Sequence, residues 1–343
     1  MRRPAPPTAA SAAAAAAAAL LLLLLPLLAR PASACGFTIH MSVTHRALNS
    51  YFGGPPAAFE MLLAENRGAV EGGSPFPDYG YQCGPNHDDG EYTHWTPFQF
   101  WAATWLRAAY PSPLNASGRA TAAFLAGAVS HYVADISWHG LAETPQDYGL
   151  IETIGFLDFN CTGLCQPAHS QADEGGEFVA AYATALAFDD PNAWVIPVAD
   201  LVSILRFVNR TAEKGHMGAG DIEECAVEFY AGAEAVKALA GLAEPLMVYG
   251  SPTFAEEIVG LPCGGLDDMA VYAARMWQRW WVGCANARTS TISAHCFASV
   301  RHVLQARATC HALGACATRY AQRLSSCCAL FARTRSSAIA RNA

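Results

Sequence analysis

The nine residues from His131 to His139 constrain the chain more than any other stretch. They lie in an apolar run from Ala122 to Leu141 that has helical length and contains no proline. Positions i, i+4 and i+8 of a helix stay within a quarter turn of one another, so both histidines and Asp135 project from one face. A carboxylate buried between imidazoles is costly unless it is compensated, and His with Asp is a zinc-type ligand set. The stretch therefore predicts a metal site on a buried helix; the alternative is a satisfied core histidine with a helical ion pair.

Other histidines and carboxylates repeat this chemistry along the chain. His169 and Asp173 are again four residues apart, Asp78 lies in a turn-rich stretch, and His94 precedes an aromatic residue. One such pair is a weak signal, whereas several in one chain indicate a shared site for more than one divalent cation.

The predicted fold class is all-α, because no stretch alternates apolar and polar residues with the period of a strand. The helices expected from apolar periodicity and capping are Ser42–Phe52, Ala57–Asn66, Phe98–Tyr110, Ala122–Leu141, Pro167–Ala187, Asp200–Val208, Ile222–Ala243 and Met269–Val282. Two stretches, Gly68–Pro77 and Gln82–Tyr92, are expected to be loops because they are rich in glycine, proline and polar residues.

The two ends of the chain differ from its body. Two arginines, an Ala/Leu run and an A-x-A site ending at Ala34 predict a secretory signal peptide over residues 1–34; the alternative is a membrane anchor. Cleavage there leaves Cys35 as the amino terminus of a body that extends to residue 286. Residues 287–343 hold eight arginines and five cysteines but no Asp, Glu or Lys, and are expected to be a poorly ordered basic tail.

Secretion predicts disulfides and glycans in the body. Disulfides are expected for its remaining six cysteines, although the spacing of Cys161 and Cys165 also suits a metal clip. These cysteines are Cys83, Cys161, Cys165, Cys225, Cys263 and Cys284. N-glycosylation sequons occur at Asn115, Asn160 and Asn209.

The charge of the body restricts its partners. Between Cys35 and Ala287 there are 10 basic and 29 acidic residues, which repel nucleic acids and anionic membranes at long range. This excess suits a protein that loads several divalent cations. We expect no nucleic-acid partner.

Several motifs resemble those of a known family. They are Cys35-Gly, Thr44-His45-Arg-Ala-Leu, Phe76-Pro-Asp78, Thr93-His94-Trp-Thr-Pro-Phe, Ala134-Asp135-Ile-Ser-Trp-His139 and Gly264-Gly-Leu-Asp-Asp-Met-Ala. On these motifs the chain from about Cys35 to Ala285 is similar to the zinc-dependent phospholipase C and P1-type nuclease family and, within it, to the branch of glycosylphosphatidylinositol-specific phospholipases D.

The resemblance implies three zinc ions and assigns their ligands. The first ion would take Asp78, His94, His131 and Asp135; the second would take His139, His169 and Asp173; the third would take the amine and carbonyl of Cys35 with His45 and a bridging Asp135. His40 is the alternative to His45. The wider family places five residues between its first Asp and the next His, whereas Asp135 and His139 are separated by three.

The resemblance also implies an activity. It predicts a secreted, extracellular phosphodiesterase that hydrolyses the inositol–phosphate linkage of glycosylphosphatidylinositol anchors, meets the membrane transiently, and releases anchored proteins and phosphatidic acid. Asp78, His131 and Asp135 are the expected catalytic residues. His87, Asp88 and Asp89 could line the site or form a solvated loop.

Two alternatives to this function stay open. The first is a phospholipase C or single-strand nuclease of the same fold. The second is a truncated, inactive form that binds metal or lipid, because the sequence lacks the β-propeller repeats of full-length family members.

A cluster of tryptophans, Trp277, Trp280 and Trp281, could contact acyl chains, although helical spacing is more typical of a core.

Overall fold

The computed structural model describes residues 36–50, 57–83, 87–139, 149–161, 165–184, 193–208, 216–260 and 264–281, and within these ranges every regular element is a helix. The prediction of an all-α fold is therefore confirmed. The elements are α2 (Phe37–Ser50), α3 (Ala57–Glu65), α4 (Arg67–Gly73), η1 (Phe76–Asp78), α5 (Tyr79–Gln82), α6 (His87–Thr93), α7 (Thr96–Ala109), α8 (Ala116–His139), α9 (Leu150–Asp158), α10 (Gln166–Thr184), α11 (Val198–Val208), α12 (Ala219–Gly250), α13 (Pro252–Glu257) and α14 (Leu266–Trp280).

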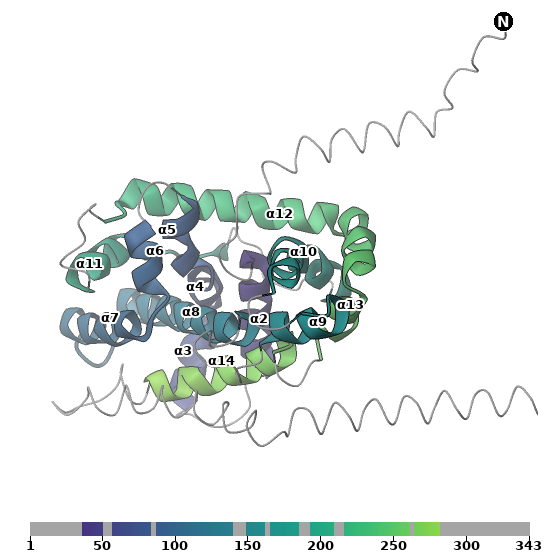
Figure 1. Ribbon diagram of the computed structural model, residues 1–343. Coiled ribbons are helices and arrows are strands. Elements are labelled where there is room, and N and C mark those ends of the chain that lie inside the picture. Colours follow the sequence, from purple (N-terminus) through teal and green to yellow (C-terminus); the bar gives the residue numbers. More distant parts are fainter. Residues whose placement is uncertain are drawn as a thin grey trace, which may run out of the picture.

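The central element is α8, which contains the stretch that dominates the sequence. Residues 121–134 are all buried, as expected for a helix that is apolar around its whole circumference. It packs most extensively against α4 and α14 and also contacts α2 and α7. Figure 1 shows α12 along the top of the molecule and α14 along the bottom, with α8 between them.

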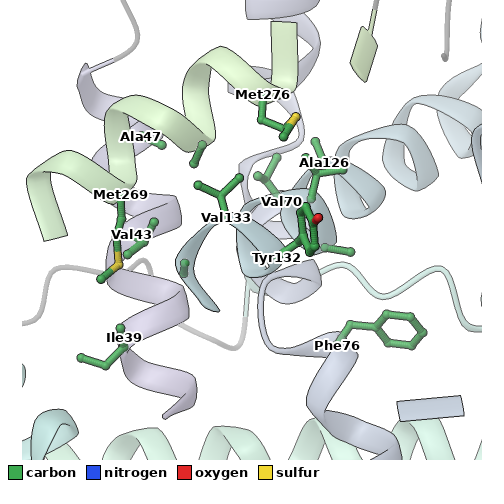
Figure 2. Close-up of a cluster of buried hydrophobic side chains, with 14 of the residues drawn as sticks. Ile39, Val43, Ala47, Val70, Phe76, Ala126, Tyr132, Val133, Met269 and Met276 are labelled. Carbon is green, nitrogen blue, oxygen red and sulfur yellow. The ribbon is translucent and has the colours of Figure 1, made fainter. Parts of the chain in front are cut away.

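The core around α8 is built from side chains at helical spacing. Ile39, Val43 and Ala47 of α2 are four residues apart and fully buried, so they define one face of that helix. Figure 2 shows this face near Met269 of α14 and Val133 of α8. His40 directly follows Ile39 on α2, so its side chain projects about 100° away from this apolar stripe.

One expected loop is a helix in the structure. The glycine-rich stretch from Gly68 forms most of α4, which is buried against α8. A Cβ atom on Gly73 would lie 2.0 Å from the carbonyl oxygen of Phe124, and one on Gly127 would lie 2.0 Å from that of Val70. These glycines therefore allow two helices to approach closely, and the prediction of a loop was wrong because it treated them as turn residues.

Other helix bounds also differ from expectation. The loop expected at Gln82–Tyr92 contains α6, and α2 begins at Phe37, five residues before the expected helix. The long helix α12 continues past Pro245 to Gly250. The helices expected near Phe98, Asp200 and Met269 are present as α7, α11 and α14.

Four of the six cysteines that were expected to form disulfides lie in the described ranges, and all four are paired. Cys83 pairs with Cys225 across 142 residues of sequence, and Cys161 pairs with Cys165, which excludes the metal clip. No helix within the described ranges is both long and apolar enough to cross a bilayer.

Several predictions lie outside the described residues. These are the signal peptide, Cys35, Cys263, Cys284, the sequon at Asn209 and the tail from residue 287. The other two sequons are in the described part, where Asn115 and Asn160 are both exposed.

Candidate metal centre

Five side chains from separate parts of the chain converge near the C-terminal end of α8, and we call them the first cluster. His131 and Asp135 come from α8, His40 from α2, Asp78 from the end of η1, and His94 from the residue after α6. All but Asp135 are buried, and Asp135 is partly exposed. The fold thus brings together residues separated by almost a hundred positions of sequence.

The contacts within the first cluster are those of a ligand set. His131 Nε2 lies 3.2 Å from Asp135 Oδ2, and His94 Nε2 lies 3.3 Å from Asp78 Oδ1. His40 Nε2 lies 3.4 Å from Asp135 Oδ1 and 3.8 Å from Asp78 Oδ2. Ligand atoms of His40, Asp78 and His131, and likewise of His94, His131 and Asp135, lie within 4.8 Å of one another.

The tautomers of two histidines show that this cluster suits a cation. His131 Nδ1 lies 2.7 Å from the carbonyl oxygen of Ser74, and His94 Nδ1 lies 2.7 Å from that of Gly90. A carbonyl can only accept a hydrogen bond, so each Nδ1 carries a proton and each ring directs its Nε2 into the cluster. The two Nε2 atoms are only 3.0 Å apart. A proton can bridge them, and a bound cation would take the place of that proton.

Burial and neighbouring charges set the protonation states in this cluster. Burial, together with the nearby His131 ring, lowers the pKa of His40 to about 3. Burial also lowers the pKa of His94, but the Asp78 and Asp135 carboxylates outweigh it and raise that pKa to about 9. Burial raises the pKa of Asp135, yet the surrounding imidazoles hold it well below its usual range. The carboxylate is therefore ionised, and a proton on His94 competes with a cation for the same position.

A second cluster joins the end of α8 to α10. His169 Nδ1 lies 2.7 Å from Asp173 Oδ2, and the His139 and His169 rings are 5.0 Å apart. Ligand atoms of all three residues lie within 4.8 Å of one another, and His139 Nε2 is buried with no hydrogen bond to the described part of the chain. Asp173 is held in place by Trp138, whose Nε1 donates to Oδ1 at 2.9 Å. Only three residues separate Asp135 from His139. This short spacing is possible because Asp135 belongs to the first cluster and His139 to the second, and both residues lie on the same helix.

His45 lies outside both clusters, so we take the alternative, His40, for the third ion. Its Nδ1 lies 2.9 Å from Glu71 Oε1 and 3.0 Å from a guanidinium nitrogen of Arg67. Five residues of helix separate it from His40, so the two side chains point about 140° apart. The structure places His40, the alternative, against His131 with ring centroids 3.5 Å apart. Cys35, the other expected ligand of this ion, is outside the described residues.

The sequence did not indicate Glu177, although it lies on α10 one turn beyond Asp173. Its side chain is 8% exposed, and its carboxylate accepts hydrogen bonds from the backbone of Thr38 and Phe37 at the start of α2. Burial raises its pKa to about 8. A Cβ atom on Gly36 would lie 1.9 Å from Glu177 Oε1, so a side chain at residue 36 would displace this carboxylate. Its i+8 spacing from His169 is the signal that could have identified it.

Asp89 and the tryptophan cluster have structural roles. Asp89 is buried, and its carboxylate accepts from the backbone of Met217 at 2.8 Å and lies 2.9 Å from His216 Nδ1. It therefore fixes the start of α12 and does not line the site. Trp277 and Trp280 are in the core, and the half-buried Trp281 stacks on Phe59.

Comparison with known proteins identifies a family. Residues 39–193, which include both clusters, match the zinc-dependent phospholipase C family. The phosphatidylinositol-glycan-specific phospholipase D of Dictyostelium discoideum is 35% identical over 244 residues, which are 71% of this chain and 25% of that protein. The human enzyme of the same name is 31% identical over 261 residues, which are 73% of this chain and 29% of that protein.

The bovine enzyme of that name is 30% identical over 269 residues, or 74% of this chain and 30% of that protein. The chain thus spans about a quarter to 30% of the length of these curated relatives. No solved structure matches it.

Proposed function

This chain carries a domain of the zinc-dependent phospholipase C family of hydrolases, and from that membership we propose that it cleaves glycosylphosphatidylinositol anchors. In this reaction water attacks the phosphorus atom, the bond from phosphorus to the inositol oxygen breaks, and the inositol oxygen takes up a proton. The products are phosphatidic acid and the released glycan with its protein. The relatives that carry the name of this activity support the choice of substrate.

The observation that carries the proposal is the convergence of imidazole nitrogens and carboxylate oxygens in the first cluster. Two Nε2 atoms face each other beside two carboxylates, and this donor set fits zinc. Zinc ions would supply Lewis acidity and positive charge to the reacting phosphate. His94, His131, Asp78 and Asp135 would hold one ion, and His139, His169 and Asp173 a second.

Asp78 is the residue that we assign to the attacking water. It is buried, and its Oδ2 makes no hydrogen bond to any described residue. A buried carboxylate oxygen without a donor can accept the proton of a water molecule or orient it for attack. His131 and Asp135 would fix the position of the ion, and through it that of the reacting phosphate and water, because their own positions on α8 are fixed by packing.

The third ion would use His40 with the terminal amine and carbonyl of Cys35. Cleavage after Ala34 would create that amine, so signal removal would complete the site. Secretion is part of the same proposal, with residues 1–34 as signal, 35–286 as catalytic domain and 287–343 as a separate tail. The paired cysteines support an oxidising compartment, where Asn115, Asn160 and Asn209 would carry glycans.

The substrate is tested by comparing three phosphodiesters with the purified protein. We expect release of an anchored reporter protein and formation of phosphatidic acid, with little cleavage of single-stranded DNA or phosphatidylcholine. Preferential cleavage of the DNA or of phosphatidylcholine would instead identify a nuclease or a phospholipase C. Absence of turnover on a soluble anchor analogue at full zinc content would identify an inactive metal-binding form.

Substitutions in the first cluster test the assignment of its residues. His131→Ala and Asp135→Asn should each lower kcat at least a thousandfold and reduce the zinc content, because each removes a ligand and leaves its partners uncompensated. Zinc content is measured on the same samples as kcat. Full activity with full zinc content in both variants would contradict the assignment.

A further inference from the structure

Three residues beside the first cluster form an arrangement that the metal chemistry does not use. Trp95 Nε1 donates to Glu91 Oε1 at 2.7 Å, and the hydroxyl of Tyr81 donates to Glu91 Oε2 at 2.5 Å. One carboxylate therefore fixes two aromatic rings from different segments, the end of α5 and the turn before α7. We call Tyr81, Glu91 and Trp95 the aromatic clamp.

The aromatic clamp lies between the first cluster and solvent. The Tyr81 ring is 4.9 Å from the ring of His94, centroid to centroid, and Tyr81 is half-buried. Trp95 follows His94 directly and is 51% exposed. The clamp therefore extends from the His94 ring to the exposed surface.

The chemistry of the clamp fits a polyol ring. A carboxylate offers about four acceptor positions, and the two aromatic donors occupy two of them, so Glu91 can accept further hydroxyl groups. An exposed indole whose orientation is fixed presents an apolar face with little loss of side-chain entropy on binding. The C–H face of a cyclohexane polyol can pack on that indole while its hydroxyls donate to the carboxylate.

We propose that Tyr81, Glu91 and Trp95 form the subsite that binds the inositol ring of the substrate. This proposal rests on the proposed function and adds which side chains select the alcohol side of the phosphodiester. The acyl side of the phosphate would then point away from the clamp. A quaternary ammonium group is the competing ligand, because it also pairs with aromatic rings and a carboxylate.

Competition separates these ligands without requiring anchor cleavage. The assay follows hydrolysis of bis(4-nitrophenyl) phosphate by the zinc-loaded protein with myo-inositol 1-phosphate, inorganic phosphate or choline phosphate as inhibitor. We expect myo-inositol 1-phosphate to bind at least tenfold more tightly than the other two. Trp95→Ala and Glu91→Gln should remove that preference. Tighter binding of choline phosphate, or an unchanged preference in both variants, would overturn the proposal.

A substrate comparison tests the same subsite in turnover. The quantity measured is the ratio of kcat/KM for a soluble short-chain glucosaminyl-phosphatidylinositol to kcat/KM for bis(4-nitrophenyl) phosphate. In Trp95→Ala this ratio should fall tenfold or more, mainly through a higher KM for the inositol substrate. The control is Trp101→Ala, which removes an equally large, 42% exposed indole that packs on Phe207. That control should keep the ratio.

The outcomes distinguish the two proposals. A wild-type protein that cleaves the inositol substrate, with an unchanged ratio in Trp95→Ala, would refute the aromatic clamp and leave the proposed function standing. A wild-type protein that cleaves only bis(4-nitrophenyl) phosphate would refute the proposed substrate, and the competition assay would still decide what the clamp binds. A loss that appears only with substrate in vesicles would place Trp95 at the lipid surface and overturn the polyol subsite.

Discussion

At the residue scale, the choice between His40 and His45 shows what a sequence motif leaves open. Both histidines lie on α2, and only the orientation of the helix decides which one faces α8. The apolar stripe through Ile39 and Val43 fixes that orientation and directs His40 to the cluster. By contrast, the spacing of His131 and Asp135 predicted their shared face directly, because both lie on one helix.

Glu177 gives a prediction about pH. Its pKa is raised by burial from 4.5 to about 8, so the folded protein holds a proton there that the unfolded chain releases. This contribution to stability is fully present below pH 4.5 and is lost as pH rises to about 8. In chelator-treated protein, Glu177→Gln should flatten the decline in the free energy of unfolding between these pH values.

Urea denaturation at several pH values measures this effect. Glu234→Gln is the control, because Glu234 is exposed on α12 and pairs with Lys237 at 3.2 Å. An identical pH dependence in wild type and Glu177→Gln would show that Glu177 ionises normally.

At the element scale, the packing of α4 on α8 explains why one helix was missed and how the site is held. The glycines of α4 resemble a loop in sequence, since local propensity cannot reveal that another backbone lies against them. The residue that ends this helix, Ser74, accepts the hydrogen bond from His131 Nδ1. Close approach of the two helices therefore also fixes the tautomer of a metal ligand.

A methyl group at this contact should disturb both stability and metal binding. Gly127→Ala would place Cβ 2.0 Å from the carbonyl of Val70, so α4 has to move away from α8. We expect a loss of about 1–3 kcal/mol in the free energy of unfolding and weaker zinc binding. Denaturant titration and zinc competition measure the two effects.

Gly241→Ala is the matched control for this substitution. A Cβ atom there meets nothing within 4 Å, and Gly241 lies inside α12. Its replacement should raise stability by about 0.5–1 kcal/mol, because alanine favours a helix interior. Equal effects of the two substitutions would mean that α4 and α8 do not depend on this close contact.

At the scale of the whole molecule, the sequence predicted more of the site than of the connections between helices. Absence of strand periodicity and the apolar run around His131 were enough for the fold class. The convergence of Asp78 and His94 on α8 followed from resemblance, because nothing local to either residue shows where its segment lies. The aromatic clamp could not be predicted as a whole, since the bond from Tyr81 to Glu91 joins side chains of two separate helices, α5 and α6.

The most direct test of the account is elemental analysis of the purified protein, combined with amino-terminal sequencing and an activity assay before and after chelation. We predict about three zinc ions per chain, an amino terminus at Cys35, and loss of phosphodiesterase activity on chelation that added zinc restores. A protein that contains no zinc and retains full activity in the chelator would contradict the central claim.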